Sequence, residues 1–252
     1  MYFSVMKFDF FSTIILHSEK EKRKDYRNTV IVQIIIVVSG MALSPFLDYA
    51  NPGNLDKLLI SLFSGFGALY AFLLWDLLKD FTNSRLLVTI VLITLFIITA
   101  LGLAGEFPYY QILEISNRPA YLLFLHGMLF PIEIIVIAFA IRDLFSGSEF
   151  NSSKLWGAAC VYLMIGISFG SLYDLLHITG IASFGKPMTL GLETYSESIY
   201  YSFTILGGLD SSFENTTKLI RNIGVIEAVW GNLFAILIIG KLLSLPTIQN
   251  EK

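Results

Sequence analysis

The chain has 252 residues, of which 55% are hydrophobic and only 15% are charged. A soluble domain has about a quarter of its residues charged, so this composition excludes an ordinary soluble domain and indicates an integral membrane protein. The net charge of −3, with no basic stripe on a soluble domain, predicts no nucleic-acid partner.

The first 28 residues are predicted to be a cytoplasmic N-terminal segment, in which apolar residues precede the basic cluster "EKEKRKDYR". A secretory signal has the opposite order. The segment is expected either to lie on anionic lipid as an amphipathic helix or to be a solvated tail that enforces topology. It is also the expected contact for a cytosolic protein partner.

Six segments are long and apolar enough to cross a membrane, because a span needs roughly 20 mostly apolar residues. They are 29–45, 58–78, 86–104, 120–141, 155–176 and 220–243. The first four predict a peripheral membrane domain over 29–145. A shorter semi-apolar piece, 197–206, suits a re-entrant half-helix, so 155–245 is the predicted pore domain. A short cytoplasmic tail, 246–252, follows it.

The lysines and arginines are distributed unevenly between the two sides that these six spans define. With a cytoplasmic N-terminus, 12 of the 17 lie inside and five lie outside. Cytoplasmic loops carry the excess of basic residues in membrane proteins. The sequence therefore predicts a multi-pass protein of the bacterial inner membrane with both termini in the cytoplasm.

The fourth span contains two ionisable residues, His126 and Glu133, which are seven residues apart and share a helix face. They are either a proton-sensitive or regulatory site or a satisfied polar contact between helices. They are also the only candidates for catalysis, and they form no established motif, so we expect no enzyme. No metal or cofactor site is predicted. Asp174, near the end of the fifth span, is expected to be solvated at the interface.

The last third of the chain has the order that a tetrameric cation channel requires: span, half-helix, glycine-bearing turn, acidic residues, span. Each chain would supply one quarter of a pore, so the arrangement predicts a homotetramer. Asp210 and Glu214 would then form acidic rings at the outer mouth, where they attract monovalent cations. The alternative is that they are ordinary solvated loop acids.

At these residues the chain resembles bacterial six-transmembrane potassium-channel-like proteins with a two-helix pore. The fifth span resembles their outer helix, "SIYYSF" (198–203) resembles their pore helix, and the sixth span resembles their inner helix. The matching positions are Gly157, Tyr162, Leu163, Gly166 and Tyr173 in the outer helix, and Arg221, Glu227, Ala228, Gly231 and Lys241 in the inner helix. The resemblance implies an all-α membrane fold with six spans, a pore half-helix and a tetramer.

The family's filter reads Thr-Thr-Leu-Gly-Tyr-Gly-Asp, and its counterpart here is "TILGGLD". This filter-like loop comprises Thr204, Ile205, Leu206, Gly207, Gly208, Leu209 and Asp210. Gly208 replaces the family's tyrosine and Leu209 replaces its second glycine. A leucine held in a left-handed conformation costs about 1–2 kcal/mol, so a four-site potassium filter is not expected. A shorter, wider filter and a collapsed turn both remain open.

Two residues of the sixth span, Glu227 and Gly231, are predicted to act at the base of the filter. Glu227 is expected either to face the pore or to brace the half-helix through Tyr200, Tyr201 or Ser202. Gly231 is either a flexible point or a close helix contact.

Two functions follow from these features. The first is a tetrameric cation channel with an altered filter that is not selective for potassium. The second is a non-conducting, channel-derived sensor or scaffold, of a stress- or phage-response type, that signals to a cytosolic partner.

Overall fold

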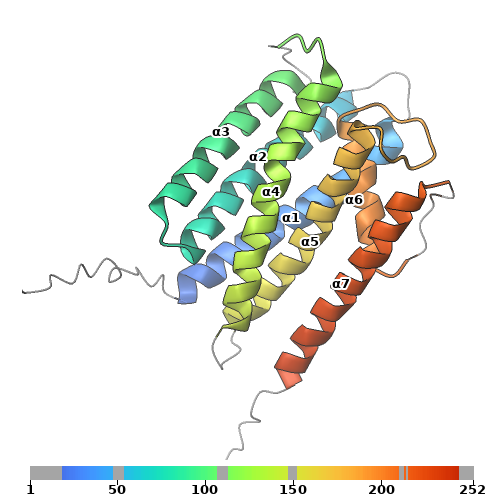
Figure 1. Cartoon of the computed structure of the whole chain (residues 1–252). Coiled ribbons are helices and arrows are strands. Elements are labelled where there is room, and N and C mark those ends of the chain that lie inside the picture. The colour runs from blue at the N-terminus through green and yellow to red at the C-terminus, as the bar shows by residue number, and fades with distance from the viewer. Residues whose placement is uncertain are drawn as a thin grey trace, which may run out of the picture.

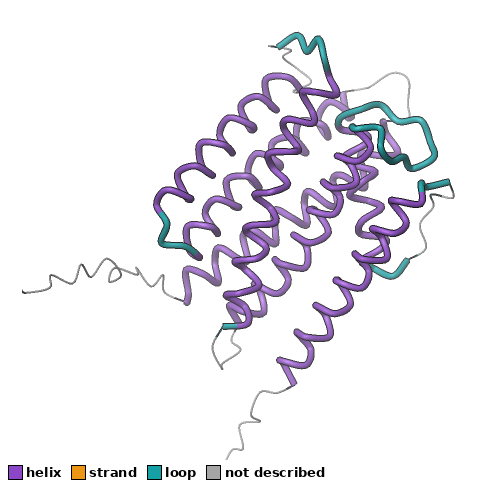
Figure 2. The backbone as a smooth tube through the Cα atoms, viewed as in Figure 1, coloured by secondary structure: helices purple, strands orange, loops and turns teal. Residues whose placement is uncertain are grey.

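The structure, a computed structural model, describes residues 19–47, 54–106, 113–146, 152–209, 213 and 215–243. These residues contain seven helices and no strand (Figures 1 and 2). The helices are α1 (Glu19–Leu47), α2 (Asn54–Phe81), α3 (Arg85–Glu106), α4 (Arg118–Phe145), α5 (Ser152–Ile178), α6 (Leu192–Leu206) and α7 (Lys218–Leu243).

Five of the described helices are long and apolar enough to cross a membrane: α2, α3, α4, α5 and α7. They match five of the predicted spans, so the chain is an all-helical protein with the character of a multi-pass membrane protein. The remaining long helix, α1, contains the predicted first span but begins at Glu19, within the basic cluster. The basic residues thus continue the helix of the apolar run, and the predicted division after residue 28 lies within one continuous helix. Residues 1–18 lie outside the described part of the chain.

Helices α1 and α5 form the centre of the bundle. α1 packs against α2, α5 and α6, and α5 also packs against α4 and α7. α2, α3 and α4 cover one side of this pair, and α6 and α7 lie on the other (Figure 1). Small residues of α5 allow the close approach: a Cβ atom on Gly157 would lie 3.1 Å from the ring of Tyr26 on α1.

The first helix begins, and α4 and α7 end, at the same end of the bundle (Figure 1). A lysine of α1 and a lysine of α7 both contact the end of α4. The Lys22 ammonium of α1 pairs with Asp143 at 2.9 Å, and Lys241 of α7 donates to the carbonyl of Leu144 at 3.2 Å.

Helix α6 is the short element of the fold. Its 15 residues correspond to about 22 Å at 1.5 Å per residue, which is less than the roughly 30 Å of a membrane core. It begins beside the end of α5 and runs only part of the way along it, and α7 begins near the end of the bundle at which α6 begins (Figure 2). The prediction placed its start at 197, five residues late, because the first turn is polar in sequence. Thr194 and Ser196 in that turn are buried and bonded: the Thr194 hydroxyl donates to the Gly191 carbonyl and the Ser196 hydroxyl donates to the Gly40 carbonyl of α1.

Candidate functional site

A buried carboxyl group, that of Glu227, joins the three C-terminal helices. Tyr173 of α5 donates to Glu227 Oε2 at 2.6 Å, and the Ser202 hydroxyl of α6 contacts Oε1 at hydrogen-bond distance. All three side chains are fully buried. Ser202 is one of the three partners expected from the sequence, whereas Tyr173 was not expected. Glu227 thus fixes α7 to both α5 and α6.

The hydrogen atoms of this cluster can be counted. The Ser202 hydroxyl has one proton but two acceptors near its oxygen, Glu227 Oε1 and the Gly166 carbonyl oxygen at 2.7 Å. Every contact carries a proton when Glu227 is a neutral acid that donates to Ser202, which in turn donates to Gly166. A neutral acid is also the form that costs least in a buried site.

A cluster of aromatic rings covers this site on the side where α6 and α7 begin. The ring of Tyr201 lies 5.0 Å from that of Tyr173 and 5.3 Å from that of Phe184, and Phe184 lies 5.1 Å from Phe213. Phe184 comes from the loop between α5 and α6, so the loop is part of the packed structure. Lys186 of the same loop pairs with Glu197 at 3.0 Å.

The predicted filter segment is not an extended strand. Helix α6 continues through Leu206 and ends in a Schellman motif, in which Leu209 N–H donates to the Thr204 carbonyl at 2.9 Å and Gly208 N–H donates to the Ile205 carbonyl at 3.1 Å. Gly208 has a φ of +66°, the left-handed angle that this motif requires. Gly208 therefore has the position and conformation of a helix-terminating glycine.

All four carbonyls at the end of α6 are engaged. Phe203 accepts from Gly207 at 3.0 Å, Leu206 accepts from the Tyr162 hydroxyl at 3.1 Å, and the other two belong to the Schellman motif. The backbone strain predicted for Leu209 does not arise, because no non-glycine residue in the described part of the chain has positive φ. Residues 204–209 of the filter-like loop thus form a helix end and its cap. Asp210 and Glu214 lie outside the described residues.

Glycines make close helix contacts around the end of α6. A Cβ atom on Gly231 would lie 2.5 Å from Leu206 Cδ2, so Gly231 is a site of close contact, the second of its two predicted roles. On α5, Gly166 and Gly170 are one turn apart, as in a small-xxx-small motif. A Cβ atom on Gly170 would lie 3.1 Å from the Ile199 Cα atom of α6.

The two ionisable residues of α4 do not contact each other. His126 Nδ1 is hydrogen-bonded to Asp174 Oδ2 of α5, and the His126 ring lies 5.1 Å from the ring of Tyr195 at the start of α6. Asp174 is 0% exposed, so the expectation that it is solvated at an interface is wrong. Helix packing turns its side chain inward, toward His126.

Glu133 lies deeper in the bundle and is also 0% exposed. Neither of its oxygens makes a hydrogen bond of ordinary geometry among the described residues, although the Ser171 hydroxyl lies beside it. Tyr70 of α2 lies near enough to interact with it electrostatically. Ionisable residues inside a membrane protein are costly and commonly functional, so this polar region marks a second candidate site.

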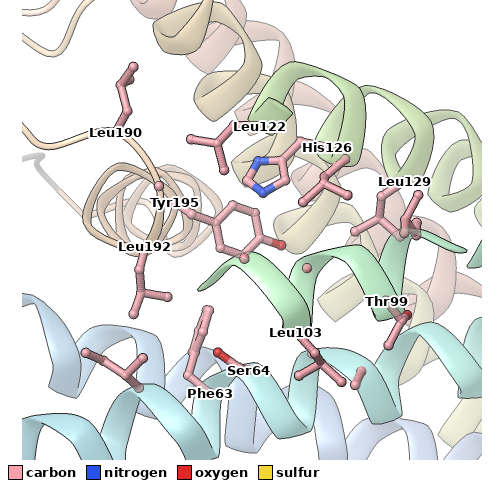
Figure 3. A pocket seen from close by; sticks show the side chains of 18 of the residues that line it. Phe63, Ser64, Thr99, Leu103, Leu122, His126, Leu129, Leu190, Leu192 and Tyr195 are labelled. Atoms are coloured by element: carbon pink, nitrogen blue, oxygen red, sulfur yellow. The ribbon is translucent and has the colours of Figure 1, made fainter. Parts of the chain in front are cut away.

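A cavity of about 770 Å³ lies beside the second site, between α2, α3, α4 and the start of α6. Figure 3 shows His126 and Tyr195 side by side at its wall, with Phe63 and Ser64 of α2 opposite and Thr99 of α3 to one side. The cavity has both aromatic and hydroxyl groups on its surface. It is therefore a site of mixed polarity rather than an apolar gap.

No family model, curated protein or solved structure matches the chain. The function accordingly has to be argued from the two sites themselves.

The sequence analysis singled out Glu227 and His126, the central residues of the two sites, but it did not predict their partners Tyr173 and Asp174. Tyr173 and Asp174 are consecutive in α5, and their side chains meet different helices, α7 and α4 respectively. A local signal existed, since two adjacent polar residues close an otherwise apolar span. The identity of their partners depends on how distant helices pack, which one sequence does not reveal.

Proposed function

We propose that the protein is a channel-derived membrane sensor, a homotetramer that does not conduct ions through the position of a potassium filter. The observation that supports this best is the state of the carbonyls at the end of α6. A potassium filter replaces the water around an ion with backbone carbonyls that point at the pore axis. The carbonyls of Phe203 to Leu206 instead accept hydrogen bonds from the protein.

The tetramer is inferred from α7. Its buried residues form one narrow stripe toward α5 and α6: Ile220, Gly224, Glu227, Gly231, Phe234 and Ile238. Much of its remaining surface is apolar and exposed, including Val225 at 65% and Ile236 at 64%. The part of this surface that faces the pore axis in the resembled family would pack against other copies, and the rest would face lipid.

The route of signalling is suggested by α1. Its second half accepts a 2.5 Å hydrogen bond from Ser196 of α6 at the Gly40 carbonyl, and its first turns contain the basic cluster. Within that cluster Arg23, Lys24 and Arg27 are exposed. A displacement of α6 would be transmitted along one continuous helix to a surface suited to an acidic cytosolic partner or anionic lipid.

The membrane placement follows the same reasoning. We propose six spans, with α1 as the sixth membrane-crossing helix and α6 as a re-entrant half-helix, in a bacterial inner membrane. The basic residues at the end where α1 begins and α7 ends favour that end as cytoplasmic.

A second candidate is the cation channel with an altered filter. It is favoured by the order of α5, α6 and α7, in which a half-length helix lies between two long ones, as in the resembled family. In that case an activated state would have to release the cap at Gly208 and expose the carbonyls. Asp210 and Glu214 would then select for cations.

Native mass spectrometry of the protein in lipid nanodiscs tests the assembly. We expect four copies, and a matched pair of variants locates the interface. Val229→Trp on α7 and Ile90→Trp on α3 both replace an aliphatic residue that is about half exposed, at 51% and 52%. Val229→Trp should shift the protein toward smaller species, whereas Ile90→Trp should leave the tetramer intact. A monomer or a two-fold dimer of the unmodified protein would contradict the proposal.

A further inference from the structure

A second function is indicated by the cavity that the peripheral helices α2, α3 and α4 form with the start of α6. We propose that this cavity is a binding site for a small protonated amine with an apolar body. Its volume of about 770 Å³ lies within the range of pockets that hold small molecules, roughly 300–1,000 Å³. The binding does not depend on whether the protein conducts ions or forms a tetramer.

Aromatic rings from three helices supply the surface for the apolar body and for a cation. Phe63 of α2 packs edge-on against Tyr195 of α6, with ring centroids 6.0 Å apart, and the His126 ring of α4 lies on the other side of Tyr195 (Figure 3). The faces of aromatic rings attract ammonium groups, most strongly where water is excluded.

Polar atoms deeper in the cavity have hydrogen-bonding capacity for a ligand. His126 bonds Asp174 through Nδ1, and in the tautomer that carries its proton on Nδ1 the other ring nitrogen, Nε2, is an acceptor. Tyr70 also lines the cavity, and its hydroxyl, which is buried, has no hydrogen-bond partner of ordinary geometry in the described part of the chain. An ammonium group donates up to three hydrogen bonds and therefore matches these acceptors.

The charges around the cavity favour a cation over an anion. Its lining contains two carboxylates, Glu114 and Glu193, and one guanidinium, Arg118. Asp174 lies directly behind His126, and Glu133 lies near Tyr70. The lining thus carries two carboxylates against one guanidinium, with the carboxyl group of Asp174 behind His126, and in a site of low dielectric this difference favours a bound cation.

A glycine of α2 allows the cavity to be filled by a single substitution. Gly67 of α2 lines it, and a Cβ atom at this position would meet nothing within 4 Å. Gly65, two residues earlier, has equally open space but is exposed and is not part of the cavity lining. Gly67→Leu should therefore occupy the cavity without disturbing α2, and Gly65→Leu is its matched control.

The test measures binding of three probes with one skeleton, phenylbutylamine, phenylbutanol and phenylbutanoate, to the full chain in lipid nanodiscs. Titration calorimetry is suitable, with empty nanodiscs as the baseline for partitioning into lipid. The amine should bind about tenfold more tightly than the alcohol, because the aromatic faces and the protein's carboxylates attract its positive charge. Phenylbutanoate should not bind, because the same groups repel its negative charge. Gly67→Leu should weaken amine binding at least about tenfold, and Gly65→Leu should leave it unchanged.

Three results would overturn the proposal: no saturable binding of the amine, binding of the carboxylate or alcohol as tight as that of the amine, or unchanged amine binding in Gly67→Leu. If Gly67→Leu does not fold, Ala68→Leu fills the same cavity from the next residue and is judged by the same criteria.

Discussion

Replacing Gly208 tests whether the segment after α6 is a helix cap. Its φ of +66° is left-handed, and a Cβ atom there would meet nothing within 4 Å. A side chain at this position therefore changes the backbone energy alone, without a clash. The left-handed conformation costs an L-residue other than glycine about 1–2 kcal/mol, less for asparagine, which is sometimes found in such caps.

We therefore expect Gly208→Ala to lower the free energy of unfolding by about 1–2 kcal/mol per chain and Gly208→Asn to lower it less. A reversible SDS titration followed by tryptophan fluorescence measures this difference. Gly180, which ends α5 with a φ of +70° and equally open surroundings, is the matched control for the same backbone cost at a distance from α6. Wild-type or greater stability of Gly208→Ala would refute the helix cap, provided that Gly180→Ala shows the expected loss.

Substitutions at two further positions, Glu227 and Gly170, test the packing of α6. Glu227→Gln should retain wild-type stability within about 0.5 kcal/mol, because an amide can accept a hydrogen bond from Tyr173 and donate one to Ser202. Glu227→Ala should lower the free energy of unfolding by about 1–3 kcal/mol, because it leaves buried polar groups unpaired. If Gln is as damaging as Ala in thermal unfolding, the neutral carboxyl inferred for Glu227 is wrong. Gly170→Leu should cost about 1–3 kcal/mol or more by forcing α6 away from α5 at Ile199, and stability equal to that of Gly65→Leu would contradict the close contact.

The long helices could be predicted from the sequence because a membrane span depends mainly on the length and polarity of a continuous segment. The apolar runs at 86–104 and 155–176, for example, lie within α3 and α5. The start of α6 could not be placed in this way. Its first turn is rich in hydroxyl groups that are polar in sequence and become buried because α1 and the residue before α6 supply acceptors.

The filter-like segment shows a different limit. The resemblance to a channel family predicted a filter-like loop from Thr204, yet the pair Gly207–Gly208 also fits a helix terminus, where glycine is the preferred residue after the cap. Both local signals were present in "LGG", and hydrogen bonding decides between them. The pairing of His126 with Asp174 likewise required the packing of α4 on α5.

Cation flux into proteoliposomes tests the central claim most directly, with tetramer formation verified in the same preparation. The protein should show no potassium or sodium flux above that of empty liposomes, because the carbonyls at the end of α6 are bonded within the protein. A cation flux that decreases in Asp210→Asn would contradict this account and establish the altered-filter channel instead.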